Sequence, residues 1–308
     1  ALLSFFALDL TSGVSTETKA TDLTSARNYC NSSNSKFDSK DFQGAIEDIT
    51  KAIEILPKEA SLYYQRGNLK IQLGEYQSAI NDFNKAIGMN PQESRIYFKR
   101  GIAKVELGDH EGAISDLNKA IDINPNYYAA FLNRGIIKAS LDEDQNAIDN
   151  FDKAIKIDHQ STIAYFHRGL AKMRLGNLKG SIADYTKSIE IESDSGSAYI
   201  MRGIVKNDSG DYQGAVDDFT KSIEIDQKEE GFYINLALLQ AKLEDYSSAI
   251  SAFTMAICIN KNNSENYSNR GHLKFESEDY QGAIEDFSKA LEINPKHKIT
   301  YYHRAIAK

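Results

Sequence analysis

The 308-residue sequence contains no tryptophan, only two cysteines and only four prolines. Two lone thiols, Cys30 and Cys258, cannot build the dense disulfide framework of small secreted domains. The sequence also lacks a glycine-rich phosphate loop, a nucleophile elbow, paired-cysteine metal spacing and an HExxH motif. These absences argue against a disulfide scaffold and against an enzyme. We therefore predict no catalytic residue, no metal site and no cofactor.

An excess of basic residues is absent as well, since the formal net charge is −8. Phosphate binding needs clustered lysine and arginine, so nucleic acid is not expected as a partner. The opening run ALLSFFALDL is too short to span a membrane. It is either the remnant of a secretory signal or a segment that packs on the first repeat or on a partner. The compartment therefore stays open between cytoplasm and export.

The dominant feature of the chain is a repeat of 34 residues. The segment DYQGAVDDFTKSIEID at 211–226 is nearly copied at 279–294, and a third version begins midway at Asp245. Eight units run from 26 to 295 without an insertion. Each has a small residue followed four positions later by a large apolar one: Ala45/Ile49, Ala79/Phe83, Ala113/Leu117, Ala147/Phe151, Ser181/Tyr185, Ala215/Phe219, Ala249/Phe253 and Ala283/Phe287. A fixed period of this size indicates stacked supersecondary units.

Each unit is predicted to be a pair of antiparallel helices. From Ala79 onward, apolar residues recur at the spacing of a helix stripe, and a second amphipathic stretch precedes them. In four units a glycine follows the first helix: Gly74, Gly108, Gly176 and Gly210. In four units a proline follows the second helix, where a helix must end: Pro57, Pro91, Pro125 and Pro295. One pair cannot bury a core alone, so neighbours must stack. The sequence predicts an all-α solenoid of stacked antiparallel helix pairs.

These columns resemble the tetratricopeptide repeat, a 34-residue helix–turn–helix unit. The resemblance covers about 26–308 and rests on Gly67, Tyr76, Ala79, Phe83, Ala86 and Pro91 and their counterparts. It implies a right-handed superhelical solenoid and a non-enzymatic scaffold that binds other proteins. Residues 296–308 repeat the first-helix pattern and are predicted to form a solvating cap helix. Residues 1–25, without a helical period, are treated as an N-terminal extension.

The first helix departs from the family pattern, because the family's Trp is Tyr here, its Leu before the glycine is Arg, and a later Tyr is Lys. Repeats that carry both cations also have an Asp just before the large apolar column: Arg66/Lys70/Asp82, Arg100/Lys104/Asp116, Arg168/Lys172/Asp184, Arg202/Lys206/Asp218 and Arg270/Lys274/Asp286. The seventh repeat loses all three together, with Leu236, Gln240 and Ala252. We interpret the triads as ion pairs between the two helices of a repeat. The rival interpretation is a basic stripe that binds a ligand.

The concave side of such a superhelix is lined by the first helices. Two columns of these helices are predicted to face inward, and from the third to the seventh repeat both are apolar: Phe98, Ile102, Leu132, Ile136, Phe166, Leu170, Ile200, Ile204, Ile234 and Leu238. A contiguous apolar run of this size marks a contact surface. The alternative is that these side chains fill the seam between adjacent repeats.

A neighbouring column is rich in side chains that can pair with a peptide backbone, and Asn133, His167 and Asn235 are assigned to the binding surface with the apolar columns. It resembles the asparagine ladder of some family members. The family's carboxylate clamp for chaperone C-termini is matched less well. Asn34, Gln65, Arg95 and Lys99 lie near its positions, but Cys30 replaces its leading lysine.

The sequence thus predicts a scaffold that holds a peptide or helix of a partner protein in its concave groove, and the chain's own tail or a second copy is among the possible occupants. The alternative is an adaptor or assembly factor that works through its convex or end faces.

Overall fold

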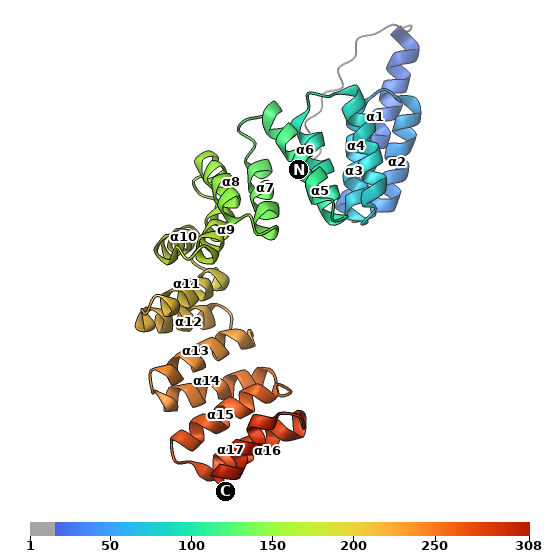
Figure 1. The fold of residues 1–308 in the computed structure, drawn as a ribbon. Coiled ribbons are helices and arrows are strands. Elements are labelled where there is room, and N and C mark those ends of the chain that lie inside the picture. Colours follow the sequence, from blue (N-terminus) through green and yellow to red (C-terminus); the bar gives the residue numbers. More distant parts are fainter. Residues whose placement is uncertain (1–15) are drawn as a thin grey trace. The chain divides into compact units, whose positions relative to one another are not determined.

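The structure is a computed structural model that describes residues 16–308, with side chains from residue 21 onward. All regular elements in this range are α-helices (Figure 1). Their contacts divide the chain into two compact units. We call residues up to Asp142 the N-terminal unit and residues from Glu143 the C-terminal unit, and we describe each by itself. The boundary falls between the two helices of the fourth repeat.

The N-terminal unit contains three antiparallel helix pairs and one further first helix: α1 (Thr16–Asp38), α2 (Phe42–Ile55), α3 (Ala60–Gln72), α4 (Tyr76–Met89), α5 (Ser94–Glu106), α6 (His110–Ile123) and α7 (Tyr128–Ser140). The C-terminal unit contains one second helix, four pairs and a last first helix: α8 (Asp144–Ile157), α9 (Thr162–Arg174), α10 (Leu178–Ile191), α11 (Gly196–Asp208), α12 (Tyr212–Ile225), α13 (Glu230–Lys242), α14 (Tyr246–Ile259), α15 (Ser264–Glu276), α16 (Tyr280–Ile293) and α17 (Lys298–Ala307). This confirms the predicted all-α solenoid of helix pairs.

Turn chemistry sets where the helices begin and end. Most second helices begin after an Asp or Asn whose side chain accepts a hydrogen bond from a backbone N–H three residues later, as Asp211 does from Gly214. The four predicted glycine stops all have left-handed φ angles, Gly74 at 75° among them. In four other repeats the same conformation is taken by residues with a side chain: Lys40, Asp142, Glu244 and Glu278.

The core of each unit lies between the two helices of a repeat and between neighbouring repeats. The small and large columns of the second helices are fully covered, with Ala79 and Phe83 both 0% exposed. Glycine in the first helix lets the aromatic ring approach, since a Cβ on Gly67 would lie 2.6 Å from the Phe83 ring. Repetition of this contact explains why the sequence keeps its period.

One end of the described chain differs from the sequence prediction. Helix α1 begins at Thr16, although residues before 26 show no apolar stripe. Among the residues with described side chains, Ala26 is the first that is buried, and it belongs to the core cluster of the first repeats. The predicted packing of the opening apolar run lies outside the described residues. At the other end α17 is a helix, as predicted, and its exposed residues include Tyr301, Tyr302 and Ile306 as well as Lys298.

Candidate binding surfaces

The Arg/Lys/Asp triads are ion pairs inside the fold. In the second repeat, Arg66 donates through Nε and Nη2 to the two oxygens of Asp82, at 2.9 and 2.7 Å, and Lys70 Nζ lies 2.8 Å from the same carboxylate. The four other complete triads have the same arrangement around Asp116, Asp184, Asp218 and Asp286. All five carboxylates are buried. This confirms the ion-pair interpretation and contradicts a ligand-binding basic stripe.

Hydrogen bonds decide the protonation of the Asp82 carboxyl. Burial by itself raises its pKa, but the hydrogen bonds from Arg66 and Lys70 outweigh burial and leave the pKa below its ordinary value. In the seventh repeat, Leu236 and Ala252 join the apolar core instead. Gln240 replaces the lysine, and its Oε1 is buried without a hydrogen-bond partner among the described residues.

Each arginine also bonds to the preceding repeat, which the sequence analysis did not predict. Arg202 Nη1 donates to Thr186 Oγ1 at 3.1 Å, and Arg270 Nη1 donates to Thr254 Oγ1 at 3.0 Å. The acceptor always stands 16 residues before the arginine, in the preceding second helix, and the column that supplies it is polar throughout: Thr50, Asn84, Asn118, Asp152, Thr186, Thr220, Thr254 and Ser288. The polar character of this column in all eight repeats is the sequence signal from which the bond could have been predicted. The guanidinium therefore connects neighbouring repeats as well as the two helices of one repeat.

In the C-terminal unit, the predicted inner columns are partly open and partly packed. Ile200 is buried in the apolar cluster around Phe219, and Ile204 and Ile234 are half-buried against the same cluster. Phe166 and Leu170 are half-buried on α9, whereas Leu238 on α13 is 50% exposed. Adjacent first helices thus present an apolar row that remains accessible along much of its length. We call Phe166, Leu170, Ile200, Ile204, Ile234 and Leu238 the inner row of the C-terminal unit.

The corresponding residues of the N-terminal unit pack more closely. Phe98 contacts the Tyr127 ring at 5.1 Å between centroids, and Leu132 is buried. Ile102 and Ile136 are half-buried.

Some side chains of the amide column form intramolecular contacts. Asn133 Nδ2 donates to the carbonyl of Ala129 in its own helix at 2.8 Å. His167 stacks on the Phe151 ring at 5.9 Å, and burial together with nearby Arg174 lowers the pKa of its imidazole. Asn235 is half-buried beside the inner row. A continuous ladder of amides is therefore interrupted by side chains with local partners.

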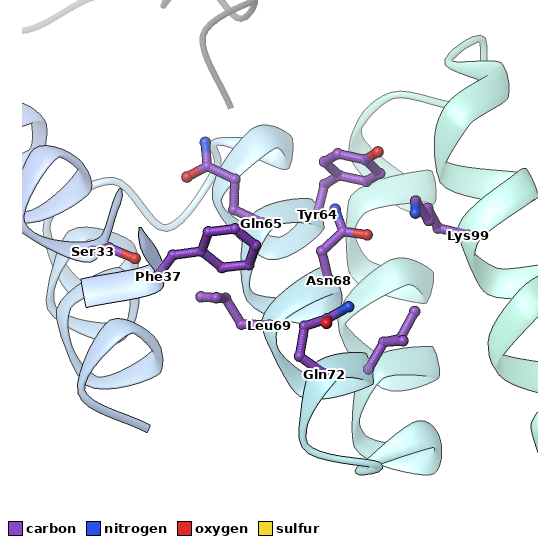
Figure 2. Close-up of a pocket in the computed structure, with 9 residues that line it drawn as sticks. Ser33, Phe37, Tyr64, Gln65, Asn68, Leu69, Gln72 and Lys99 are labelled. Carbon is purple, nitrogen blue, oxygen red and sulfur yellow. The ribbon is translucent and has the colours of Figure 1, made fainter. Parts of the chain in front are cut away.

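A cavity of about 150 Å³ lies in the N-terminal unit, among α1, α3 and α5 (Figure 2). Its walls combine apolar and amide groups: Ser33, Phe37, Tyr64, Gln65, Asn68, Leu69, Ile71, Gln72 and Lys99. Asn68 Oδ1 is buried and accepts no hydrogen bond from the described part of the chain. An amide oxygen so placed can accept a hydrogen bond from a backbone N–H of a bound segment.

The sequence analysis does not predict this cavity, because both inner columns are apolar only from the third repeat onward. The signal was present, since Tyr64 and Asn68 stand in the two inner columns and Gln65 and Lys99 in the amide column. Burial lowers the pKa of Lys99 and raises that of Tyr64. Arg95, one of the four residues near the clamp positions, pairs with Glu93 at 2.9 Å. Of the four residues near the clamp positions, Gln65 and Lys99 line the cavity, whereas Arg95 is not among its lining residues.

A second, more open hollow of about 270 Å³ lies in the C-terminal unit, where two predicted site residues, Phe166 and His167, meet serines at the start of α11. Near the C-terminus, His272 and His303 stack at 5.2 Å, as their positions in neighbouring first helices suggested. No cluster of three or more metal-ligating side chains is found among residues with described side chains. Within the same part of the chain, no helix has the length and apolar character needed to cross a bilayer.

Several family models match parts of the sequence. Models of the tetratricopeptide repeat match residues 64–128, 98–162, 163–195 and 264–297, and a model of anaphase-promoting complex subunit 5 matches 199–275. A comparison with curated protein sequences finds no significant match.

Solved structures show the same fold at low identity. The C-terminal part of a TPR repeat-containing protein from Cytophaga hutchinsonii is 18% identical with a TM-score of 0.70, and the match covers 78% of this chain and 98% of that one. YrrB, a TPR protein with an unusual peptide-binding site, is 20% identical with a TM-score of 0.55 over 61% and 97%. A chain of the APC/C hetero-tetramer Cut9–Hcn1 is 19% identical with a TM-score of 0.52 over 86% and 52%. With its period, helix pairs and matched repeats, the chain belongs to the tetratricopeptide repeat family.

Proposed function

We propose that this chain is a protein–protein interaction scaffold that holds a segment of a partner polypeptide against the inner row of the C-terminal unit. The repeat architecture supports polypeptide binding, since YrrB has a peptide-binding site and another similar chain belongs to a hetero-tetramer. The role needs no catalysis, and the triads that hold most of the buried charge are structural.

The observation that carries the proposal is the exposure of the inner row. Leu238 keeps half of its surface open, and Leu170, Ile204 and Ile234 of the same row are only partly covered. Apolar side chains that stay open on a row of parallel helices fit an amphipathic helix or an extended apolar peptide. Asn235 at its border supplies a side chain that can bond to the backbone of that segment.

The test uses peptides selected from a random phage-displayed library on the 308-residue protein. Leu238→Glu should weaken binding of the selected peptides about tenfold or more, because it places a charge in the apolar contact. The melting temperature should not change, since the side chain is half exposed. Leu175→Glu is the matched control, because Leu175 is 52% exposed but lies at the end of α9, outside the inner row.

Equal affinity of both variants would contradict the proposal. Unfolding of Leu238→Glu would instead assign the row to packing between repeats. Ile200 is less suitable for this purpose, because it is only 8% exposed and a charge there would disturb the core in either case.

A further inference from the structure

The hollow of about 270 Å³ in the C-terminal unit lies beside the Phe166 ring. This ring makes T-shaped contacts with Tyr185, at 5.5 Å between centroids, and with His167, at 5.7 Å. His167 in turn stacks on Phe151. Phe166 therefore belongs to an aromatic cluster built by α8, α9 and α10. Because Phe166 is only half-buried and lines the hollow, part of its surface is open to a further group.

The third repeat shows what fills the corresponding place. Phe98 is the counterpart of Phe166 two repeats earlier, and Tyr127 is the counterpart of Ser195. The Tyr127 ring packs on the Phe98 ring, with the two centroids 5.1 Å apart. Ser195 is too short to cover Phe166 in this way, and it lines the hollow instead. The hollow thus occupies the place that an aromatic ring takes in another repeat of the same chain.

The backbone at Ser195 has the conformation that directs the Tyr127 ring. The φ and ψ angles are −82° and 84° at Tyr127 and −82° and 89° at Ser195. Both residues are N-caps whose side chains make no capping hydrogen bond. By contrast, Ser161, one repeat before Ser195, accepts a hydrogen bond from the Ala164 N–H at 3.1 Å. Ser195 therefore has no capping role in α11, and its small side chain leaves the hollow open.

The size and charge of the hollow define the class of side chain that fits. A cavity of about 150 Å³ accepts a benzene ring, so the hollow has room for phenylalanine or tyrosine. Ser195 and Ser197 supply hydroxyl groups that can bond to the hydroxyl of tyrosine. Among the described residues that line the hollow, only Glu192 carries a formal charge when the His167 imidazole is neutral. Burial lowers the pKa of that imidazole and favours its neutral form. An anionic group such as phosphotyrosine is therefore disfavoured.

We propose that the hollow beside Phe166 receives a phenylalanine or tyrosine side chain of the partner polypeptide. The inference rests on the proposed function, because Phe166 belongs to the inner row as well as to the hollow. It adds the chemical class of the anchor residue in the bound segment. The contact reproduces that of Tyr127 with Phe98 and extends the aromatic cluster by one ring. A lysine or arginine that pairs with Glu192 is the rival occupant.

The first probe is N-acetyl-tyrosinamide, titrated into the isotope-labelled 308-residue protein and followed by the chemical shifts of the backbone amides. We expect saturable shifts at Phe166, Ser195 and Ser197. Ser195→Tyr should abolish the shifts at Phe166 and Ser197, because the ring of the protein itself then fills the hollow. Ser209→Tyr is the matched control, since it adds the same ring at an exposed position at the other end of α11.

Three outcomes of this titration overturn the proposal. One is the absence of saturable shifts up to about 20 mM, a concentration that still detects very weak binding. Another is binding of N-acetyl-tyrosinamide to Ser195→Tyr as tightly as to the wild type. The last is saturation with N-acetyl-lysinamide but not with N-acetyl-tyrosinamide, which would assign the hollow to a basic side chain held by Glu192.

The phage-selected peptides connect the hollow with the inner row. We expect them to share an aromatic residue whose replacement by alanine weakens binding to the wild type about tenfold or more. The same replacement should cost little in Ser195→Tyr, because that variant has already lost the contact. If Leu238→Glu weakens binding and Ser195→Tyr does not, the anchor in the hollow is wrong and the proposed function stands. The reverse result keeps the hollow as a site and contradicts binding along the inner row.

Discussion

At the scale of single residues, the arginine of the first helix has the most connected position in the repeat. In the sixth repeat Arg202 bonds to both oxygens of Asp218, to Thr186 of the preceding second helix, and stacks on Tyr199. Its side chain is only 15% exposed. Loss of this one group therefore leaves several buried polar atoms without partners.

This position gives a sharp prediction. Arg202→Ala should lower the free energy of unfolding by about 3 kcal/mol, because it leaves the Asp218 carboxylate buried with half of its compensation. The triple change Arg202→Leu, Lys206→Gln and Asp218→Ala, which copies the seventh repeat, should stay within about 1 kcal/mol of the wild type. Urea denaturation followed by circular dichroism measures both.

If both variants lose the same free energy of unfolding, the three charged groups stabilise the fold by their mutual attraction. The interpretation of the triad as mutually dependent groups would then be wrong. Lys289→Ala is a suitable control, because its pair with Glu292 on the surface of α16 is largely exposed and should contribute little.

The triads show how far residue roles could be read from the sequence. Eight copies in one chain let Arg, Lys and Asp be compared, and their joint loss at Leu236, Gln240 and Ala252 predicted that they touch. The bond from each arginine to the preceding repeat was missed. It involves a column that is always polar, so no joint change revealed it.

At the scale of elements, the second helices were predicted well, because each has a small residue and a large one on a single stripe. The first helices were harder. Their two inner columns are apolar both where they stay open, as at Leu238, and where they are buried, as at Ile200. The sequence cannot separate these cases, because burial there depends on the neighbouring repeat. The start of α1 at Thr16 was missed because no apolar stripe marks it in the sequence before Ala26.

Helix α17 should respond to pH through His303. Burial, together with neighbouring His272 and His297, lowers the pKa of the His303 imidazole below its ordinary value. The folded state therefore favours the neutral ring, and this contribution is present above about pH 6.5 and is lost as the pH falls below it. Hydrogen exchange of α17 amides, corrected for intrinsic rates, should be faster at pH 5.5 than at pH 7.5.

The matched variant is His303→Asn, because Asn269 and Asn235 occupy the same column in the two preceding repeats. It should remove most of the pH dependence of α17. The helix should remain in place, since Thr300 and Ala307 still hold it. A pH dependence that persists in His303→Asn would assign the effect to another group.

At the scale of the whole molecule, the repeat predicted an uninterrupted array, while the contacts divide the chain after Asp142, within the fourth repeat. This repeat is also the one in which Asn150 replaces the aspartate of the triad although Arg134 and Lys138 are kept. The Asn150 departure is visible in the sequence, but the division is not, because the repeat keeps its length and its apolar columns. The inner row of the C-terminal unit stays a prediction as a binding surface, and the sequence analysis overlooked the cavity of the N-terminal unit.

The C-terminal unit should fold when it is produced alone as residues 143–308. Its apolar cluster around Phe219 and Phe253 and its triads at Asp184, Asp218 and Asp286 all lie within it. We expect a helical circular dichroism spectrum and one cooperative thermal transition. A fragment without a cooperative transition would mean that these contacts do not suffice.

The role of α8 at the edge of this unit can be isolated with a shorter fragment, residues 162–308. Removing α8 takes away the Phe151 ring that stacks on His167 and the Asp152 carboxylate that accepts a hydrogen bond from Arg168. It also exposes the apolar face of α9 that Phe151 covers. In a repeat array a terminal helix stabilises mainly its direct neighbour. The shorter fragment should therefore melt at a lower temperature and exchange faster in α9, while α15 and α16 keep the protection that they have in the longer one.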